Sequence, residues 1–167
     1  ENLRFFDLNG LVRSKQQVQF HETFIASCMR NIYRDEYASN YLKILKDNKF
    51  DEIVQEVLVC CPRRFGKTFA AGMFCAAYLR SVPNCTICIF SPGKRQSKMM
   101  LELVVNFLKK YPNGDSSILT KNAETIKVKG TTPNDIRQCW GYPSNVETLR
   151  GVGGDVLILE EMAAMDT

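Results

Sequence analysis

Three apolar runs alternate with helical patterns, and this order restricts the fold more than any other feature of the chain. The runs are residues 52–61 (EIVQEVLVCC), 85–91 (CTICIFS) and 156–159 (VLIL). Short apolar runs that stop at proline or at charged residues are typical of strands buried in a parallel sheet. Apolar residues at helical spacing fill the intervals 67–80 and 94–111. The order strand, helix, strand, helix, strand predicts an α/β fold with a mainly parallel sheet flanked by helices.

Two other parts of the chain carry weaker patterns. Residues 14–46 have apolar side chains at spacings of three and four with an interruption near Asp35–Ser39, which favours two helices. We therefore expect a helical segment over residues 1–51 and the sheet-containing core over residues 52–167. Within the core, residues 115–142 carry short strand patterns separated by turn residues, which favour a hairpin or a small meander.

The composition is that of an ordinary globular domain. Of the 167 residues, 45% are hydrophobic and 24% are charged, which excludes a disordered chain, a collagen-like repeat and a disulfide-rich miniprotein. Lys and Arg exceed Asp and Glu by 22 to 18, and the net charge of +4 permits a polyanionic partner without requiring one. The sequence has no uncharged apolar run of about 18 residues, so no membrane span is predicted.

Cysteine and histidine give no evidence of redox or metal chemistry. The seven cysteines stand mostly within apolar runs, which is typical of reduced, buried thiols in an intracellular protein. Cys85 and Cys88 have CxxC spacing, but residues three apart in a strand point to opposite faces, so neither a disulfide pair nor a zinc site is predicted there. His21 is the only histidine, and we expect it at the surface.

The most informative segment is residues 61–68 (CPRRFGKT), at the junction between the first apolar run and the helix that follows. Gly66 permits a tight turn whose backbone amides point at a phosphate group. Lys67 suits the β- and γ-phosphates of a nucleotide, and the Thr68 hydroxyl suits Mg²⁺. This is the Walker A arrangement, although the first glycine of the pattern GxxxxGK(S/T) would fall at Cys61. An ordinary turn from strand to helix is the alternative.

An acidic pair supplies an independent indication. Glu160 and Glu161 directly follow the apolar run 156–159, as in a Walker B strand that delivers carboxylates to Mg²⁺ and to an attacking water. Two exposed glutamates at the start of a helix are the alternative, since Met162–Met165 is helix-like. Because both motifs occur in the expected order and context, the sequence predicts nucleoside triphosphate binding.

Several details resemble one family. The loop PRR-x-GKT, a second strand ending in Ser-Pro before a basic helix, an Arg-Gly before the acidic strand and a carboxylate pair followed by Met-Ala-Ala resemble the ATPase domain of the large subunit of viral DNA-packaging terminases. The resemblance, to the herpesvirus and tailed-phage type, covers residues 52–167. It implies a P-loop NTPase of the RecA-like, ASCE type that ends soon after the Walker B strand, so we expect a truncated core.

The resemblance also implies roles for individual residues. Thr68 and Glu160 would hold Mg²⁺, and Glu161 would activate the attacking water. Arg63 in the loop and Arg150 are the candidate arginines for the transferring phosphoryl group, with a surface ion pair as the alternative for Arg150. In the family an Asp precedes the Glu of the pair, and Glu160 takes its place here. The residues expected to bind ATP are Pro62, Arg63, Arg64, Phe65, Gly66, Lys67, Thr68 and Gln19, with Lys67 also catalytic.

Adenine recognition in the family comes from a glutamine upstream of the phosphate loop. Gln16, Gln17 and Gln19 are available, and Gln19, before an amphipathic helix, is the one we select. Solvated glutamines at a helix end are the alternative.

The resemblance implies a viral motor protein that hydrolyses ATP to move double-stranded DNA into a preformed capsid. Its partners would be the DNA, a portal protein, a small terminase subunit and further copies of the chain in a ring on the portal, inside the infected cell and in the nucleus if the virus is herpesvirus-like. A helicase-type ATPase dependent on nucleic acid is the alternative function. A small-molecule kinase fits poorly because such enzymes seldom carry two consecutive carboxylates, and no acidic cluster for nuclease chemistry is present.

Candidate DNA contacts come from two basic segments and two aromatic residues. Trp140 and Tyr142 flank Gly141 and suit a nucleotide or DNA contact, with packing under a loop as the alternative. The basic side chains suit DNA phosphates if they share a face, and a solvated charged surface is their alternative. They are Lys94, Arg95, Lys98, Lys109, Lys110, Lys121, Lys127 and Lys129.

Overall fold

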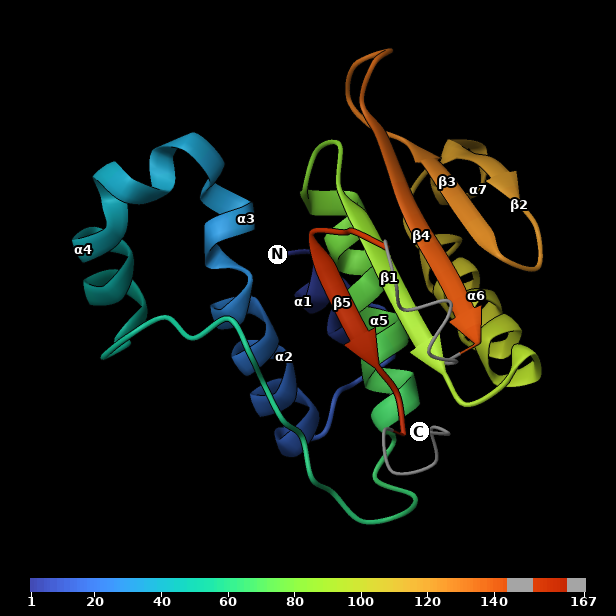
Figure 1. Cartoon of the computed structure of the whole chain (residues 1–167), viewed down its shortest axis with the longest axis horizontal. Helices are drawn as coiled ribbons and strands as arrows, with labels where there is room; N and C mark the ends of the chain where they lie inside the picture. Colours follow the sequence, from blue (N-terminus) through green and yellow to red (C-terminus); the bar gives the residue numbers. More distant parts are fainter. Residues whose placement is uncertain (144–151, 162–167) are drawn as a thin grey trace. The chain divides into compact units, whose positions relative to one another are not determined.

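The computed structural model describes residues 1–143 and 152–161, and the chain divides into two compact units (Figure 1). The first, here called the sheet unit, comprises residues 1–12 and 68–167. The second, here called the helical unit, comprises residues 13–67. Among the described residues, none of the helices has the length and apolar character needed to cross a membrane.

The sheet unit contains a five-stranded mixed sheet in the order β2-β3-β4-β1-β5. In its parallel part, β1 (Thr86–Ser91) lies between β4 (Ile136–Pro143) and the edge strand β5 (Val156–Leu159) and pairs in parallel with both. The other two strands, β2 (Ile118–Lys121) and β3 (Thr125–Lys129), extend the sheet from β4 as an antiparallel meander. The predicted α/β class and the predicted meander are therefore confirmed. The sheet is mixed and not mainly parallel as predicted, because the antiparallel meander is continuous with the parallel strands.

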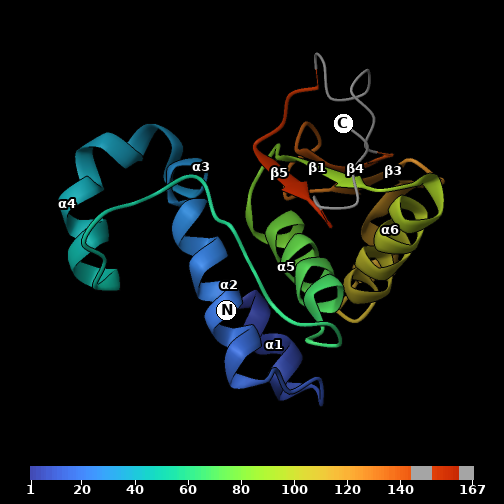
Figure 2. The ribbon, with the colours of Figure 1, turned by 60° about the horizontal axis from the view of Figure 1, so that its bottom comes forward.

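Helices cover one face of this sheet (Figure 2). The predicted buried helix is confirmed as α5 (Lys67–Ser81), of which residues 70–79 are all buried. The predicted basic and apolar helix is α6 (Lys94–Leu108), which turns an apolar side to the sheet. At Gly141 of β4 the helix comes so close that a Cβ atom would lie 2.6 Å from Ser97 Oγ.

The two shortest helices of the sheet unit are α1 (Asn2–Leu8) and α7 (Gly114–Ser117). Phe6 of α1 is completely buried, with its ring centroid 5.3 Å from that of Phe107 and 4.9 Å from that of Tyr111. The start of the chain thus packs with α6 in the core of the sheet unit.

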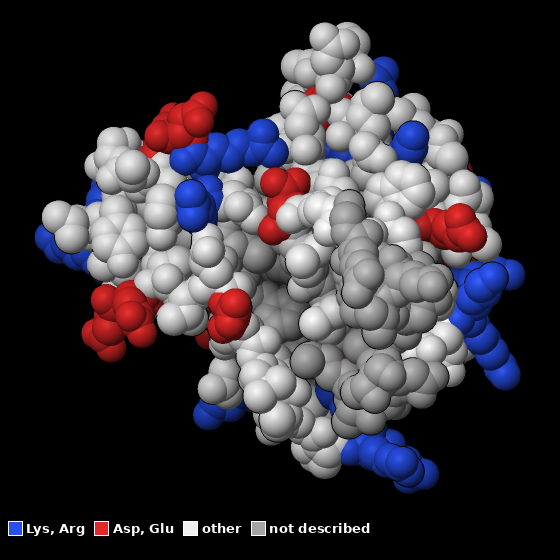
Figure 3. Space-filling model, viewed as in Figure 1, with Lys and Arg blue, Asp and Glu red and all other residues white. Residues whose placement is uncertain are grey.

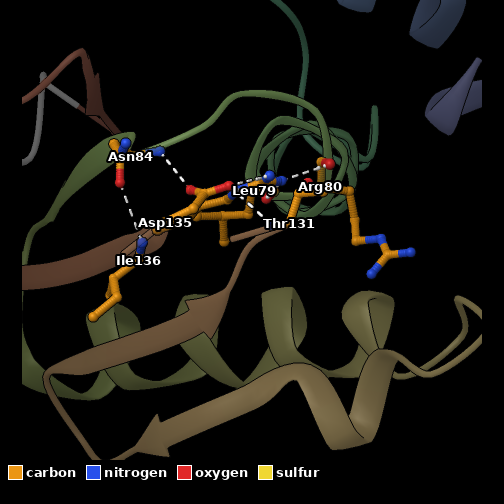
Figure 4. A network of polar contacts seen from close by, with 7 residues as sticks. Leu79, Arg80, Asn84, Thr131, Asp135 and Ile136 are labelled. Carbon is orange, nitrogen blue, oxygen red and sulfur yellow. Dashed lines mark hydrogen bonds and ion pairs between the residues drawn. The ribbon is translucent and has the colours of Figure 1, made fainter. Parts of the chain in front are cut away.

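A buried ion pair fastens the end of α5 to the sheet (Figure 4). Arg137 and Asp135 are 5% and 3% exposed, and Arg137 Nη2 lies 2.7 Å from Asp135 Oδ2. The guanidinium donates to the carbonyl oxygens of Leu79 and Arg80, in the last turn of α5, where carbonyl groups lack partners within the helix. The Asp135 carboxylate also accepts hydrogen bonds from the backbone amides of Asn84 and Thr131. The hydrogen bond from Arg137 holds the pKa of Asp135 well below its usual range.

The helical unit contains four short helical elements. They are α2 (Lys15–Ser27), α3 (Met29–Tyr33), a 3₁₀ turn (Arg34–Glu36) and α4 (Tyr37–Asn48). The predicted helical character is confirmed, but the chain also breaks at Cys28, before the predicted interruption.

The prediction of a strand over residues 52–61 is wrong. The segment has no regular secondary structure, and Val54 and Leu58 are 50% and 79% exposed. An apolar run forms a strand only when its backbone groups find a hydrogen-bonded neighbour, and within the described residues no strand pairs with this segment. The apolar composition alone could not supply that partner.

Two smaller predictions are corrected as well. Five of the seven cysteines are buried as predicted, but Cys60 is exposed because it lies in the segment that forms no strand. His21 is buried, against the prediction of a surface position, and its Nδ1 lies 3.0 Å from Arg13 Nη1. This polar contact makes burial of an imidazole tolerable.

Candidate functional site

The candidate site lies at the carboxyl edge of the parallel strands. Ser91 is the last residue of β1, and Glu160 directly follows β5. The Glu160 amide donates to the carbonyl oxygen of Phe90 at 2.8 Å, which extends the pairing of the two strands one residue beyond β5. In open α/β sheets, ligands bind at this edge. The backbone of Glu160 is therefore fixed where a ligand is expected.

Three side chains meet at this edge, and we call them the carboxylate cluster: Thr68, Ser91 and Glu160. The Thr68 hydroxyl donates to Glu160 Oε1, although the two residues are 92 positions apart in the chain. The Ser91 hydroxyl lies 3.4 Å from Glu160 Oε2. One carboxylate is thus held between a hydroxyl from the first turn of α5 and a hydroxyl from the end of β1.

The chemistry of the cluster suits a small hard cation. All of its polar atoms are oxygens, the donors that Mg²⁺ prefers in proteins. Ser91 is buried, Glu160 is half-buried and Thr68 is exposed, so the cluster is accessible from the side of α5. Across residues 1–143 and 152–161, no three His, Cys, Asp or Glu side chains gather in a metal-binding group. A cation here would take its remaining ligands from phosphate and water, as Mg²⁺ commonly does.

Glu161 has an uncommon backbone conformation directly after the cluster. Its φ of +53° lies in the left-handed region, which residues other than glycine seldom adopt. Such conformations occur often at functional sites, where the surrounding structure holds them. The side chain of Glu161 is exposed.

The boundary between the two units falls within the sequence of the predicted phosphate loop. Residues up to Lys67 belong to the helical unit, and the second segment of the sheet unit begins at Thr68. Two loop residues have a left-handed backbone, Arg64 with φ of +65° and Gly66 with φ of +83°. Glycine adopts this conformation without steric cost, which explains its place in the loop. Pro62, Arg63 and Arg64 are exposed, and Phe65, Gly66 and Lys67 are half-buried.

Within the helical unit, the glutamine beside the phosphate loop is Gln17. Its Nε2 lies 3.0 Å from the point that a Cβ atom on Gly66 would occupy. Gln17 also caps α2, because its Oε1 accepts from the Ser14 amide while Ser14 Oγ accepts from the Gln17 amide. Gln19, the glutamine selected from the sequence, is exposed, and nothing described brings its side chain to the loop.

The remaining sequence candidates are spread over the chain. Arg150 lies outside the described residues. Lys98 of α6 and Lys121 of β2 line one small pocket of about 100 Å³, whereas Lys109 pairs with Asp115 at 2.7 Å. On the face of the sheet unit that Figure 3 shows, the described Lys and Arg side chains stand apart along the rim.

The predicted aromatic pair is stacked. The rings of Trp140 and Tyr142 are nearly parallel, with an interplanar angle of 9° and a centroid distance of 6.2 Å. Tyr142 stacks in turn on Phe90 of β1 at 5.3 Å. The pair is therefore packed along the sheet.

Ser91 and Gln17 were not predicted as site residues, although both have a recognisable signal in the sequence. Ser91 is the last residue of a buried strand, and the rule that ligands bind at carboxyl strand edges could have selected it. Gln17 stands three residues after Ser14, and this spacing is that of a capping box, which fixes the direction of the glutamine side chain.

The sequence was compared with models of protein families and with curated proteins, and no match was found. The function of the chain must therefore be inferred from its own residues, above all from the carboxylate cluster and the phosphate loop.

Proposed function

We propose that the chain is a P-loop ATPase that uses Mg²⁺, and that it serves as the ATPase motor of a viral terminase. The observation that carries the proposal is the contact between the Thr68 hydroxyl and the Glu160 carboxylate. The sequence motifs assign both residues to one magnesium ion, and residues that share an ion must lie together. The terminase assignment rests further on the resemblance of residues 52–167.

ATP would bind with its phosphates at the loop around Gly66 and at the first turn of α5. Backbone amides of the loop and the positive end of the helix dipole favour phosphate there, and Lys67 adds a full positive charge. Thr68 and Glu160 would hold Mg²⁺, which supplies charge neutralisation at the β- and γ-phosphates when bound. Within the helical unit, Gln17 and not the exposed Gln19 is the glutamine beside the loop at Gly66.

Hydrolysis requires an activated water and positive charge near the transferring phosphoryl group. Glu161, exposed beside the cluster, would orient the water and accept its proton, a role worth about 10²–10⁴ in rate. Arg63 or Arg64 of the loop, or Arg150, would stabilise the equatorial oxygens, and an arginine in that position contributes about 10³–10⁵. Double-stranded DNA, a portal protein and a small terminase subunit are the proposed partners.

The test of this proposal is the Glu161→Gln variant. It should retain ATP binding and lose at least about 10² in Mg²⁺-dependent turnover, because an amide cannot accept the proton. Glu102→Gln is the matched control, since Glu102 is an exposed glutamate of α6 outside the cluster. ATP hydrolysis by Glu161→Gln at the rate of the control would refute the assignment.

A helicase-type ATPase is the second candidate because it shares the phosphate loop and the carboxylate pair. Stimulation of ATP hydrolysis by a portal protein supports the terminase. Strand separation of a tailed duplex supports the helicase.

A further inference from the structure

One buried hydroxyl at the cluster is unexplained by the nucleotide-binding motifs. Ser91 is completely buried at the end of β1, a strand whose other buried residues are apolar or cysteine. A hydroxyl removed from water without a hydrogen-bond partner is destabilising, so a serine at this position calls for an acceptor. The acceptor that the structure offers is Glu160 Oε2, 3.4 Å from the Ser91 hydroxyl.

The hydroxyl groups of Thr68 and Ser91 contact different oxygens of the Glu160 carboxylate. Thr68 donates to Oε1 of Glu160, which by itself leaves the carboxylate free to rotate about that contact. Ser91 lies against Oε2, and the Glu160 amide is bonded to Phe90. Three separate contacts therefore restrain the Glu160 backbone and both oxygens of its carboxylate. A glutamate needs such restraint more than an aspartate, because it has one more rotatable bond.

We propose that Ser91 is a positioning residue that sets the orientation in which Glu160 meets the cation. This inference rests on the proposed Mg²⁺-nucleotide site and deepens it. It also explains why glutamate is suited to position 160 in this chain. The Ser91–Glu160 contact is already at the long limit of a hydrogen bond, and an aspartate, shorter by roughly one C–C bond of about 1.5 Å, would not span both hydroxyls.

The proposal makes Ser91 act through Glu160, so the two residues must be energetically coupled. A double-mutant cycle measures such coupling, because the effect of one substitution is compared in the presence and absence of the other. Ser91→Ala removes the hydroxyl, and Glu160→Asp retracts the carboxylate from it. Ser97→Ala is the matched control, since Ser97 is 2% exposed and its hydroxyl has no described hydrogen-bond partner.

The experiment is titration of the whole chain with Mn²⁺ in the presence of a non-hydrolysable ATP analogue, followed by electron paramagnetic resonance of the free ion. Ser91→Ala should weaken Mn²⁺ binding about three- to tenfold, the effect of one ordinary hydrogen bond, because the 3.4 Å contact is long, and Ser97→Ala should bind like the parent. In the Glu160→Asp background, Ser91→Ala should change the affinity by less than about twofold. Affinity for the analogue in EDTA should be the same for Ser91→Ala and the parent.

The outcomes separate this inference from the proposal on which it rests. If Glu160→Gln abolishes Mn²⁺ binding while Ser91→Ala binds like Ser97→Ala, the positioning role is refuted and the metal site stands. An equal effect of Ser91→Ala in both backgrounds also refutes it. If the parent chain binds Mn²⁺ no better with the analogue than without it, the proposed function itself fails and the inference falls with it.

Discussion

The buried ion pair between Asp135 and Arg137 allows a stability prediction with a magnitude. Asp135→Ala leaves the guanidinium of Arg137, 5% exposed in the folded chain, without its counter-charge. It also removes the acceptor of the backbone amides of Asn84 and Thr131. Removing one partner of a buried ion pair costs about 3–5 kcal/mol, and each unsatisfied amide adds about 1 kcal/mol if water does not reach it. Because Asn84 and Thr131 are exposed and water can reach their amides, only the ion-pair term remains, and we expect a loss of about 4 kcal/mol, a large share of the stability of an ordinary domain.

The assay is urea unfolding followed by circular dichroism. With a slope of about 2 kcal/mol per molar urea, the midpoint of Asp135→Ala should fall by about 2 M. Asp115→Ala is the matched control, because Asp115 pairs with Lys109 at the same 2.7 Å but its side chain is 77% exposed. Exposed pairs contribute about 0–1 kcal/mol, so the control should unfold close to the parent. Equal midpoints for the two variants would refute the structural role of the buried pair.

Three further predictions follow from burial and charge. The Arg137 hydrogen bond lowers the pKa of Asp135 in the folded chain. The stability that ionised Asp135 contributes is therefore fully present above the unfolded pKa of about 3.9 and is lost progressively as the pH falls below that value. In urea unfolding, the free energy of unfolding should fall less between neutral and acidic pH for Asp135→Asn than for the parent, and an equal fall would contradict this. Phe6→Ala, at a completely buried site, should cost about 3–5 kcal/mol in the same assay, and a loss under about 1 kcal/mol would mean that α1 is not part of the core. A thiol reagent should modify the exposed Cys60 before the five buried cysteines, which should react only in denaturant, and rapid reaction of all seven thiols would argue against the fold.

The elements predicted well are those whose signal is local. The continuous burial of α5 and the strand β1 follow from runs of apolar residues. The strand β5 was also predicted from such a run, but its predicted burial is wrong, because β5 lies at the edge of the sheet and Leu157 and Leu159 are 56% and 42% exposed. The short strands of the meander were predictable from turn residues such as Gly130 and Pro133. The parallel pairing of β4 with β1 was not, because register and neighbour depend on contacts far apart in the chain.

The same distinction explains the failure at residues 52–61 and the partial success at the site. An apolar run there suggested a strand, but strand formation depends on a hydrogen-bonded neighbour that composition does not reveal. Thr68 and Glu160 could be selected because each belongs to a motif with fixed spacing. Ser91 belongs to no such motif, and its place beside Glu160 depends on the pairing of β1 with β5.

The most direct test of a shared Mg²⁺–ATP site is the Mg²⁺ dependence of ATP binding, measured with a fluorescent analogue in Mg²⁺ and in EDTA. We expect Mg²⁺ to tighten binding by the parent chain about tenfold or more, and we expect Thr68→Ala to lose this gain because the cation loses a protein ligand. Thr120→Ala, at an exposed threonine of β2 outside the cluster, should behave like the parent. Equal affinity in Mg²⁺ and EDTA, or a full Mg²⁺ effect in Thr68→Ala, would contradict a shared cation site at Thr68 and Glu160.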